Sequence, residues 1–173
     1  MTINENSKDL LSVLWAGADI LRSKMDANEY KNYLLGIVFY KYLSDTFLTH
    51  VYDLINNEKP ENMIAAQKSY EEICNTEDAD ELLEDIKESY HYTIVPELTY
   101  TKLAEKANNN AFQREDLQKA FNNIEQSDRI FANLFADIDL YSTRLGTGEQ
   151  KQSATISELV KTINTADLLN HEG

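Results

Sequence analysis

The chain has 173 residues, a formal net charge of −14, five glycines, two prolines and one cysteine. This length fits one well-buried domain rather than two, and few glycines and prolines favour helices over a sheet-rich fold. Because Cys74 is the only cysteine, the chain can form neither a disulfide framework nor a cysteine metal cage. A single cysteine is consistent with a protein of the reducing cytoplasm.

The first expected element is a helix from Ser7, its capping residue, to Lys24. Its apolar residues recur on one face at helical spacing. We expect Trp15 to pack on the next helix, and Ala16 and Gly17 to let a neighbour approach closely.

The segment from Met25 to Asn57 is expected to be a long central helix. Asp26 can cap its first turn while Glu29 reaches back to complete a capping box. From Tyr33 to Leu43, only Gly36 and Lys41 interrupt an apolar run, which predicts a helix covered by other elements on every side. We expect a second helix to cross closely at Gly36.

The remainder of the chain predicts shorter elements around this helix. A polar turn around Pro60 precedes two acidic helices. Residues 90–95 alternate and are the best candidate for a short strand, although they can also be half of a small hairpin or simply an extended segment. Further helices are expected at about 63–74, 80–88, 100–108, 112–125 and 155–163, with a turn or short helix at 127–135 and a loop at 137–148. The expected fold is therefore all-α, a multi-helix bundle in a single domain over 1–173.

No catalytic or metal-binding motif is found. His50, His91 and His171 are far apart in the sequence, and the acidic run at 77–85 lacks the ligand order and central glycine of a calcium loop. Gly146 and Gly148 lack the third glycine and preceding strand of a dinucleotide loop. The N-terminal residues lack a signal-peptide core, and no apolar run reaches the roughly 18 residues of a membrane span. We expect a cytoplasmic protein without membrane association.

Three sequence blocks resemble the N-terminal helical domain of the modification (M) subunit of type I restriction–modification systems. They are Leu14-Trp15-Ala16, the turn at 25–30 (MDANEY) and the helix end at 39–45 (FYKYLSD). Residues 95–97 (VPE) and 137–146 (DIDLYSTRLG) resemble later parts of the same domain more weakly.

This resemblance implies a function for the complete subunit in bacterial defence. It implies transfer of a methyl group from S-adenosylmethionine to adenine N6, together with a specificity subunit, a second M subunit and a motor-nuclease subunit. The family's Asn-Pro-Pro-Phe/Tyr motif is absent, because Pro60 and Pro96 are not adjacent. The resemblance thus implies that the catalytic methyltransferase domain would follow residue 173, and that this fragment alone is not an enzyme and binds no cofactor. Its expected role is to help assemble the enzyme and close it around DNA.

Charge is spread unevenly along the chain. Residues 1–50 sum to −1, residues 51–100 to −10 and residues 101–173 to −3. Such acidity opposes direct DNA binding by the free chain. The acidic middle is either a solvated face or a docking surface for a basic partner, and the alternative function is a stand-alone acidic interaction or DNA-mimic protein. The candidate residues for DNA or subunit contact are Arg22, Lys24, Lys31 and Lys41.

Overall fold

The computed structural model describes residues 9–169 and is all-α over that range, with no β-strand. In chain order the helices are α1 (Leu10–Leu21), α2 (Ala27–Asn56), α3 (Met63–Cys74), α4 (Ala79–Tyr90), the 3₁₀ turn η1 (Pro96–Leu98), α5 (Tyr100–Asn108), α6 (Arg114–Ser127), the 3₁₀ turn η2 (Arg129–Phe131) and α7 (Glu149–Ile163). The prediction of an all-α fold is confirmed.

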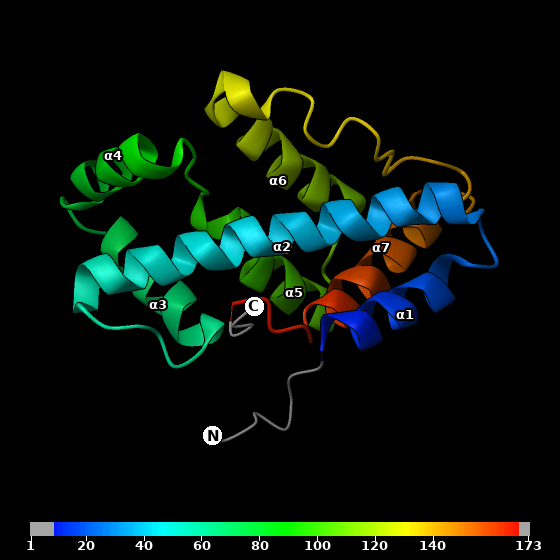
Figure 1. Ribbon diagram of the computed structural model, residues 1–173, viewed down its shortest axis with the longest axis horizontal. Helices are drawn as coiled ribbons and strands as arrows, with labels where there is room; N and C mark the ends of the chain where they lie inside the picture. The colour runs from blue at the N-terminus through cyan, green and yellow to red at the C-terminus, as the bar shows by residue number, and fades with distance from the viewer. Residues whose placement is uncertain (1–8, 170–173) are drawn as a thin grey trace.

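The long helix α2 runs along the long axis of the molecule (Figure 1). α1, α5 and α7 lie along one side of it in this view, α6 lies along the other, and α3 packs on its C-terminal half. The core lies between α2 and these helices, where residues such as Ile37, Tyr40 and Leu48 are fully buried. Phe121 of α6 stacks on Phe135 with ring centroids 4.1 Å apart, beside Tyr40.

Side-chain caps fix where several helices begin. The Asp26 carboxylate accepts from the Glu29 amide of α2 at 3.1 Å, as the sequence predicts. Glu29 does not complete the expected capping box; its carboxylate pairs with Arg144 instead. For α1 the cap is Asp9, which accepts from the Ser12 amide at 2.8 Å, so the helix begins later than expected; Ser7 lies outside the described residues.

Of the alternatives for residues 90–95, the strand and the hairpin do not form, because tertiary hydrogen bonds hold this segment without a partner strand. Tyr90 still belongs to α4, residues 92–95 are neither helix nor strand, and Val95 is extended. The Ile94 carbonyl accepts from the Tyr70 hydroxyl at 2.5 Å, and the Tyr92 hydroxyl donates to the Leu43 carbonyl at 2.7 Å. Hydrogen bonds from tyrosine hydroxyls thus hold this segment in place, whereas a strand would need backbone hydrogen bonds to a second strand.

The connection between η2 and α7 packs along the N-terminal half of α2. The Tyr33 hydroxyl donates to the Asp139 carbonyl at 2.5 Å, and a Cβ on Gly36 would overlap with the side chain of Ile138. The close contact at Gly36 is therefore with this connection, and the expected helix crossing there is wrong. Gly17 does make a close helix contact, because a Cβ there would lie 2.5 Å from Leu34 Cδ2.

α7 begins at Glu149, whereas the predicted start is near residue 155. The prediction misses the first turns of the helix because their buried residues are polar. Gln152, Ser153 and Thr155 are buried. Thr155 Oγ1 donates to the Leu145 carbonyl at 2.7 Å, and Ser153 Oγ accepts from the Arg114 amide at 3.0 Å. Hydrogen bonds satisfy this face, so no apolar periodicity marks it.

Two expectations about apolar burial are wrong. Trp15 is 61% exposed and does not pack into the core. The apolar run in α2 is not covered on every side either, because Leu35, Phe39 and Tyr42 are exposed. The residues that face inward are Tyr33, Leu34, Ile37, Tyr40 and Leu43. One face of the central helix therefore remains open in this chain.

Candidate interaction surface

Three of the four candidate contact residues lie at the surface near the turn between α1 and α2. Arg22 and Lys24 belong to this turn, and Lys31 lies in the first part of α2. Arg22 Nη1 forms an ion pair with Asp19 Oδ1 at 3.1 Å, and both side chains are well exposed. An exposed pair of this kind contributes little to stability and can exchange partners easily.

Lys41 is separated from these three because it is only 4% exposed. Its ammonium group forms an ion pair with Asp45, one helical turn later, and lies 5.7 Å from the centroid of the Tyr100 ring. Lys41 therefore does not present its ammonium group at the surface of the described domain. It compensates a buried carboxylate instead.

The surroundings of this pair show how deeply it is buried. Burial raises the pKa of Asp45 above its ordinary value, although Lys41 opposes the shift and the charge of Asp167 adds to it. Burial and the nearby Asp45 charge also raise the pKa of Tyr100, whose hydroxyl donates to the Val160 carbonyl at 2.7 Å. Ser44 Oγ accepts from the Tyr100 amide at 2.8 Å. The sequence motif at 39–45 is thus mainly a structural device that joins α2, α5 and α7.

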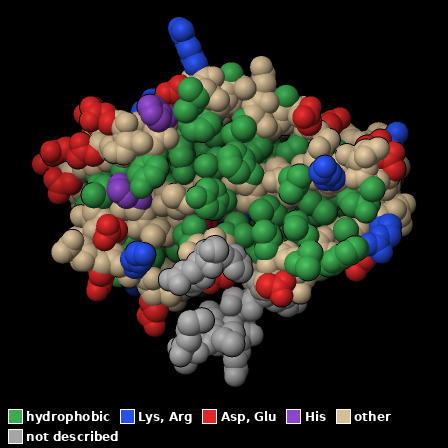
Figure 2. Space-filling model, viewed as in Figure 1, with side chains coloured by type: hydrophobic (Ala, Val, Ile, Leu, Met, Phe, Trp, Pro, Cys, Tyr) green, Lys and Arg blue, Asp and Glu red, His purple; other side chains and the backbone are tan. Residues whose placement is uncertain are grey.

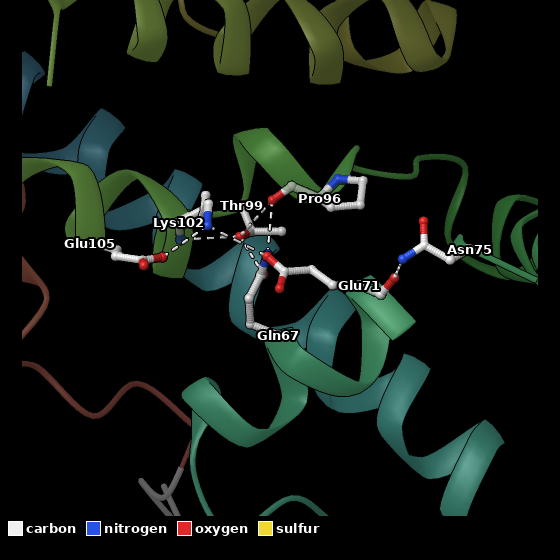
Figure 3. A network of polar contacts seen from close by, with 7 residues as sticks. All are labelled: Gln67, Glu71, Asn75, Pro96, Thr99, Lys102 and Glu105. Atoms are coloured by element: carbon white, nitrogen blue, oxygen red, sulfur yellow. Dashed lines mark hydrogen bonds and ion pairs between the residues drawn. The ribbon is translucent and has the colours of Figure 1, made fainter. Parts of the chain in front are cut away.

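A second polar network joins α3 to the start of α5 (Figure 3). Gln67 Nε2 donates to the Pro96 carbonyl at 2.9 Å, and Thr99 Oγ1 donates to Gln67 Oε1 at 2.6 Å. Lys102 reaches Glu105 at 3.1 Å, and this carboxylate helps to raise the pKa of Lys102. An open groove of about 400 Å³ beside the network has both charge signs in its lining. The network connects α3 with α5, and its groups are already paired with one another.

The acidic side chains of the middle third gather at one end of the molecule. Figure 2 shows them at the left, over the region of α3 and α4, whereas Lys and Arg are scattered over the same view. The same figure shows hydrophobic side chains in a band along α2. The charge pattern therefore separates an acidic end from an apolar front face. The sequence predicted the acidic end but not the open apolar face.

The described part of the chain holds neither an assembled metal site nor a membrane-spanning helix. Between residues 9 and 169, no group of three or more His, Cys, Asp or Glu side chains is arranged to hold a metal ion. His50 instead contacts the Tyr90 hydroxyl at 3.2 Å, and His91 contacts Asp128 at 3.3 Å. Over the same residues, no helix combines the length and apolar character that a bilayer crossing requires.

The described residues thus form an all-α bundle with an acidic end and an apolar front face. The HsdM N-terminal domain family matches residues 10–163, so the chain belongs to this family. The family forms the N-terminal domain of the methyltransferase subunit of type I restriction–modification systems.

Two similar proteins agree with this assignment. One is the methyltransferase subunit of a type I restriction–modification system from Streptococcus thermophilus, whose structure matches with a TM-score of 0.89 at 46% identity over 94% of this chain. The other is the methylase subunit of the type I restriction enzyme MpnII from Mycoplasma pneumoniae, 26% identical over 167 residues, or 90% of this chain. The chain spans only 35% and 30% of these two proteins, respectively.

Proposed function

We propose that this domain helps to assemble a type I DNA methyltransferase and to close it around DNA. In the proposal, a catalytic domain follows residue 173 and binds S-adenosylmethionine. The complete subunit acts in the cytoplasm with a specificity subunit, a second M subunit and a motor-nuclease subunit. It methylates adenine N6 on a base flipped out of the duplex. The observation that carries the proposal is the agreement of fold and sequence with the Streptococcus thermophilus methyltransferase subunit.

The features of the domain suit assembly better than chemistry. Its buried ion pair is formed within the domain: the Lys41 ammonium pairs with Asp45, and both side chains are almost fully buried. Its surface instead offers the exposed cations Arg22, Lys24 and Lys31 at one place and an apolar face along α2 at another. A clamp element needs such protein-contacting surfaces and little DNA affinity of its own.

The proposal is tested by removing the domain from the complete subunit. We expect the shortened subunit to keep S-adenosylmethionine binding, measured by calorimetry, because the cofactor site lies in the catalytic domain. Methylation of a cognate duplex in the presence of the specificity subunit should be lost, and dissociation from DNA should become faster. An Arg22→Ala/Lys24→Ala/Lys31→Ala variant of the intact subunit should bind cofactor normally and lose only DNA or subunit affinity.

Unchanged methylation and unchanged DNA dissociation by the shortened subunit would contradict the role in closure. Loss of cofactor binding would instead show that the domain contributes to the catalytic site.

A further inference from the structure

α2 carries an exposed apolar stripe formed by Leu35, Phe39 and Tyr42, here called the α2 stripe. Leu35 is 49% exposed and Tyr42 is 46% exposed. Spacings of four and three residues place the three side chains on one face of the helix. Leu134 lies beside them and is exposed as well. Leu35, Phe39 and Leu134 line, with neighbouring residues, a surface hollow of about 220 Å³ (Asn32, Leu35, Gly36, Phe39, Leu134, Phe135, Asp137, Ile138).

The core of the domain uses these side chains only in part: Phe39 packs on Phe135 with ring centroids 6.4 Å apart, but 39% of its surface stays exposed. Ile37 and Tyr40 are fully buried, so α2 is already packed by its opposite face. Figure 2 shows a band of hydrophobic side chains along the front of the molecule, where α2 runs. A continuous apolar band on a soluble protein marks a surface that another element covers.

The charge around the stripe disfavours DNA as the covering element. Lys31 precedes Leu35 by one helical turn and lies on the same face, while Asp137 lines the adjoining hollow. One cation beside one acid provides no clustered positive charge for a phosphate backbone. An apolar protein surface fits this composition better, with Lys31 at its polar rim.

The course of the chain indicates which protein surface this is. The last described residues run below the middle of α2 (Figure 1). Asp167 lies close enough to Asp45, three residues beyond Tyr42, for its charge to act on that carboxyl. The match to this chain covers only 35% of the solved Streptococcus thermophilus subunit. A continuing polypeptide would therefore leave the domain at the edge of the α2 stripe.

The size of the stripe also favours a segment of the same polypeptide over a second copy. From Leu35 to Tyr42 the helix rises only about 10 Å. A stable interface between separate chains needs roughly 800 Å² on each partner. A tethered partner acts at a high effective concentration, so a smaller apolar contact is sufficient.

We propose that the α2 stripe is the docking face for the region of the same polypeptide that follows residue 173. The contact rests on the proposed function, because it requires the catalytic domain to be present. It would fix the orientation of the helical domain relative to that region, with Phe39 and Tyr42 at the centre of the contact.

Hydroxyl-radical footprinting of the 1–173 chain and of the complete, monomeric polypeptide tests the proposal. We expect oxidation of Phe39 and Tyr42 to fall at least about five-fold in the complete polypeptide, because side chains at an interface core lose most of their exposure. Equal oxidation in both proteins would overturn the proposal. Protection that appears only when the protein dimerises, or only when another subunit is added, would assign the stripe to that partner and overturn it too.

A pair of matched variants provides a second measurement. Leu35→Glu should speed proteolytic cleavage between the two regions of the complete polypeptide. Leu54→Glu should not, although Leu54 is 48% exposed on the same helix, because it lies about 100° away around the axis. Equal cleavage rates in the two variants would overturn the proposal, and thermal melts of the 1–173 variants check that both fold.

The proposal and the proposed function can fail separately. A complete polypeptide that methylates DNA with its specificity subunit, yet leaves Phe39 and Tyr42 reactive, overturns the docking contact alone. Protection of both residues in a polypeptide that never methylates adenine overturns the proposed function alone.

Discussion

Lys41 and Asp45 form an ion pair that water barely reaches. The desolvation of two buried charges offsets much of their attraction, but removing only one partner leaves the other charge uncompensated. The intact pair therefore contributes little net stability, but the loss of one partner is strongly destabilising.

We expect Lys41→Met to lower the free energy of unfolding by about 3–5 kcal/mol, while Lys41→Met/Asp45→Leu should recover most of that loss. Because burial already raises the pKa of Asp45, the deficit of the single variant should narrow as the pH falls toward the ordinary aspartate pKa of about 4, where a neutral carboxyl needs no counter-charge. Urea unfolding of the three proteins at neutral and acidic pH measures this. A double variant as unstable as the single one would contradict it.

Buried tyrosines make the fold sensitive to alkali. Burial raises the pKa of Tyr40, Tyr70, Tyr92 and Tyr100 well above the value of 10.0 for a free phenol. A raised pKa means that the folded state keeps protons that the unfolded chain releases, so stability is complete below about pH 10 and falls above it.

We therefore expect these four phenols to ionise only together with unfolding, as the pH rises above about 10. Ultraviolet absorbance of tyrosinate, followed beside circular dichroism, should show coincident late transitions. Full ionisation of all ten tyrosines with the helices intact would rule out this account.

At the scale of the helix, α2 has a core face and an open face. Ile37→Ala and Leu34→Ala should each destabilise the 1–173 chain by about 2–5 kcal/mol, the range for large-to-small changes in a packed core. Leu35→Ala should change stability by only about 0.5 kcal/mol, because Leu35 is half exposed. Thermal melts of the three variants decide, and equal losses at Leu34 and Leu35 would mean that the helix is buried on both faces.

Helix patterns and turn residues predicted most of the elements. The bounds of α3 and α5 agree with the prediction, because clear stops flank them: Asn75 ends α3, and Asn108 to Asn110 end α5. The start of α7 was missed because hydrogen bonds, not apolar contacts, bury Gln152 and Ser153. Periodicity cannot reveal a buried face built from polar groups.

The candidate surface was less predictable than the fold. Lys41 was expected at the surface because a charge within an apolar run does not reveal its partner. Asp45 pairs with Lys41 because residues four apart lie on the same face of a helix. The α2 stripe was hidden for a related reason. A run that is apolar on every side predicts burial, but a single chain does not show whether the cover belongs to the same domain or to another region.

At the scale of the whole molecule, net charge governs behaviour toward DNA. With 16 Lys and Arg against 30 Asp and Glu, we expect the 1–173 chain to bind a short labelled duplex only weakly at physiological salt. Fluorescence anisotropy measures this. Sub-micromolar binding that is lost in the Arg22→Ala/Lys24→Ala/Lys31→Ala variant would instead show that the domain grips DNA directly. A DNA mimic would displace duplex from a DNA-binding partner, and competition by the isolated chain would support that alternative.

The unbroken length of α2 gives the domain the mechanics of a lever. Its 30 residues contain no proline to bend it, and at 1.5 Å per residue they form a rod of about 45 Å. The acidic helices are carried at the far end of this rod (Figure 1). A tilt of about 10° around its N-terminal end would swing that end by about 8 Å, roughly the rise of two base pairs. A small rotation of the whole domain about that end is thus amplified at its acidic end, with every packed helix left intact.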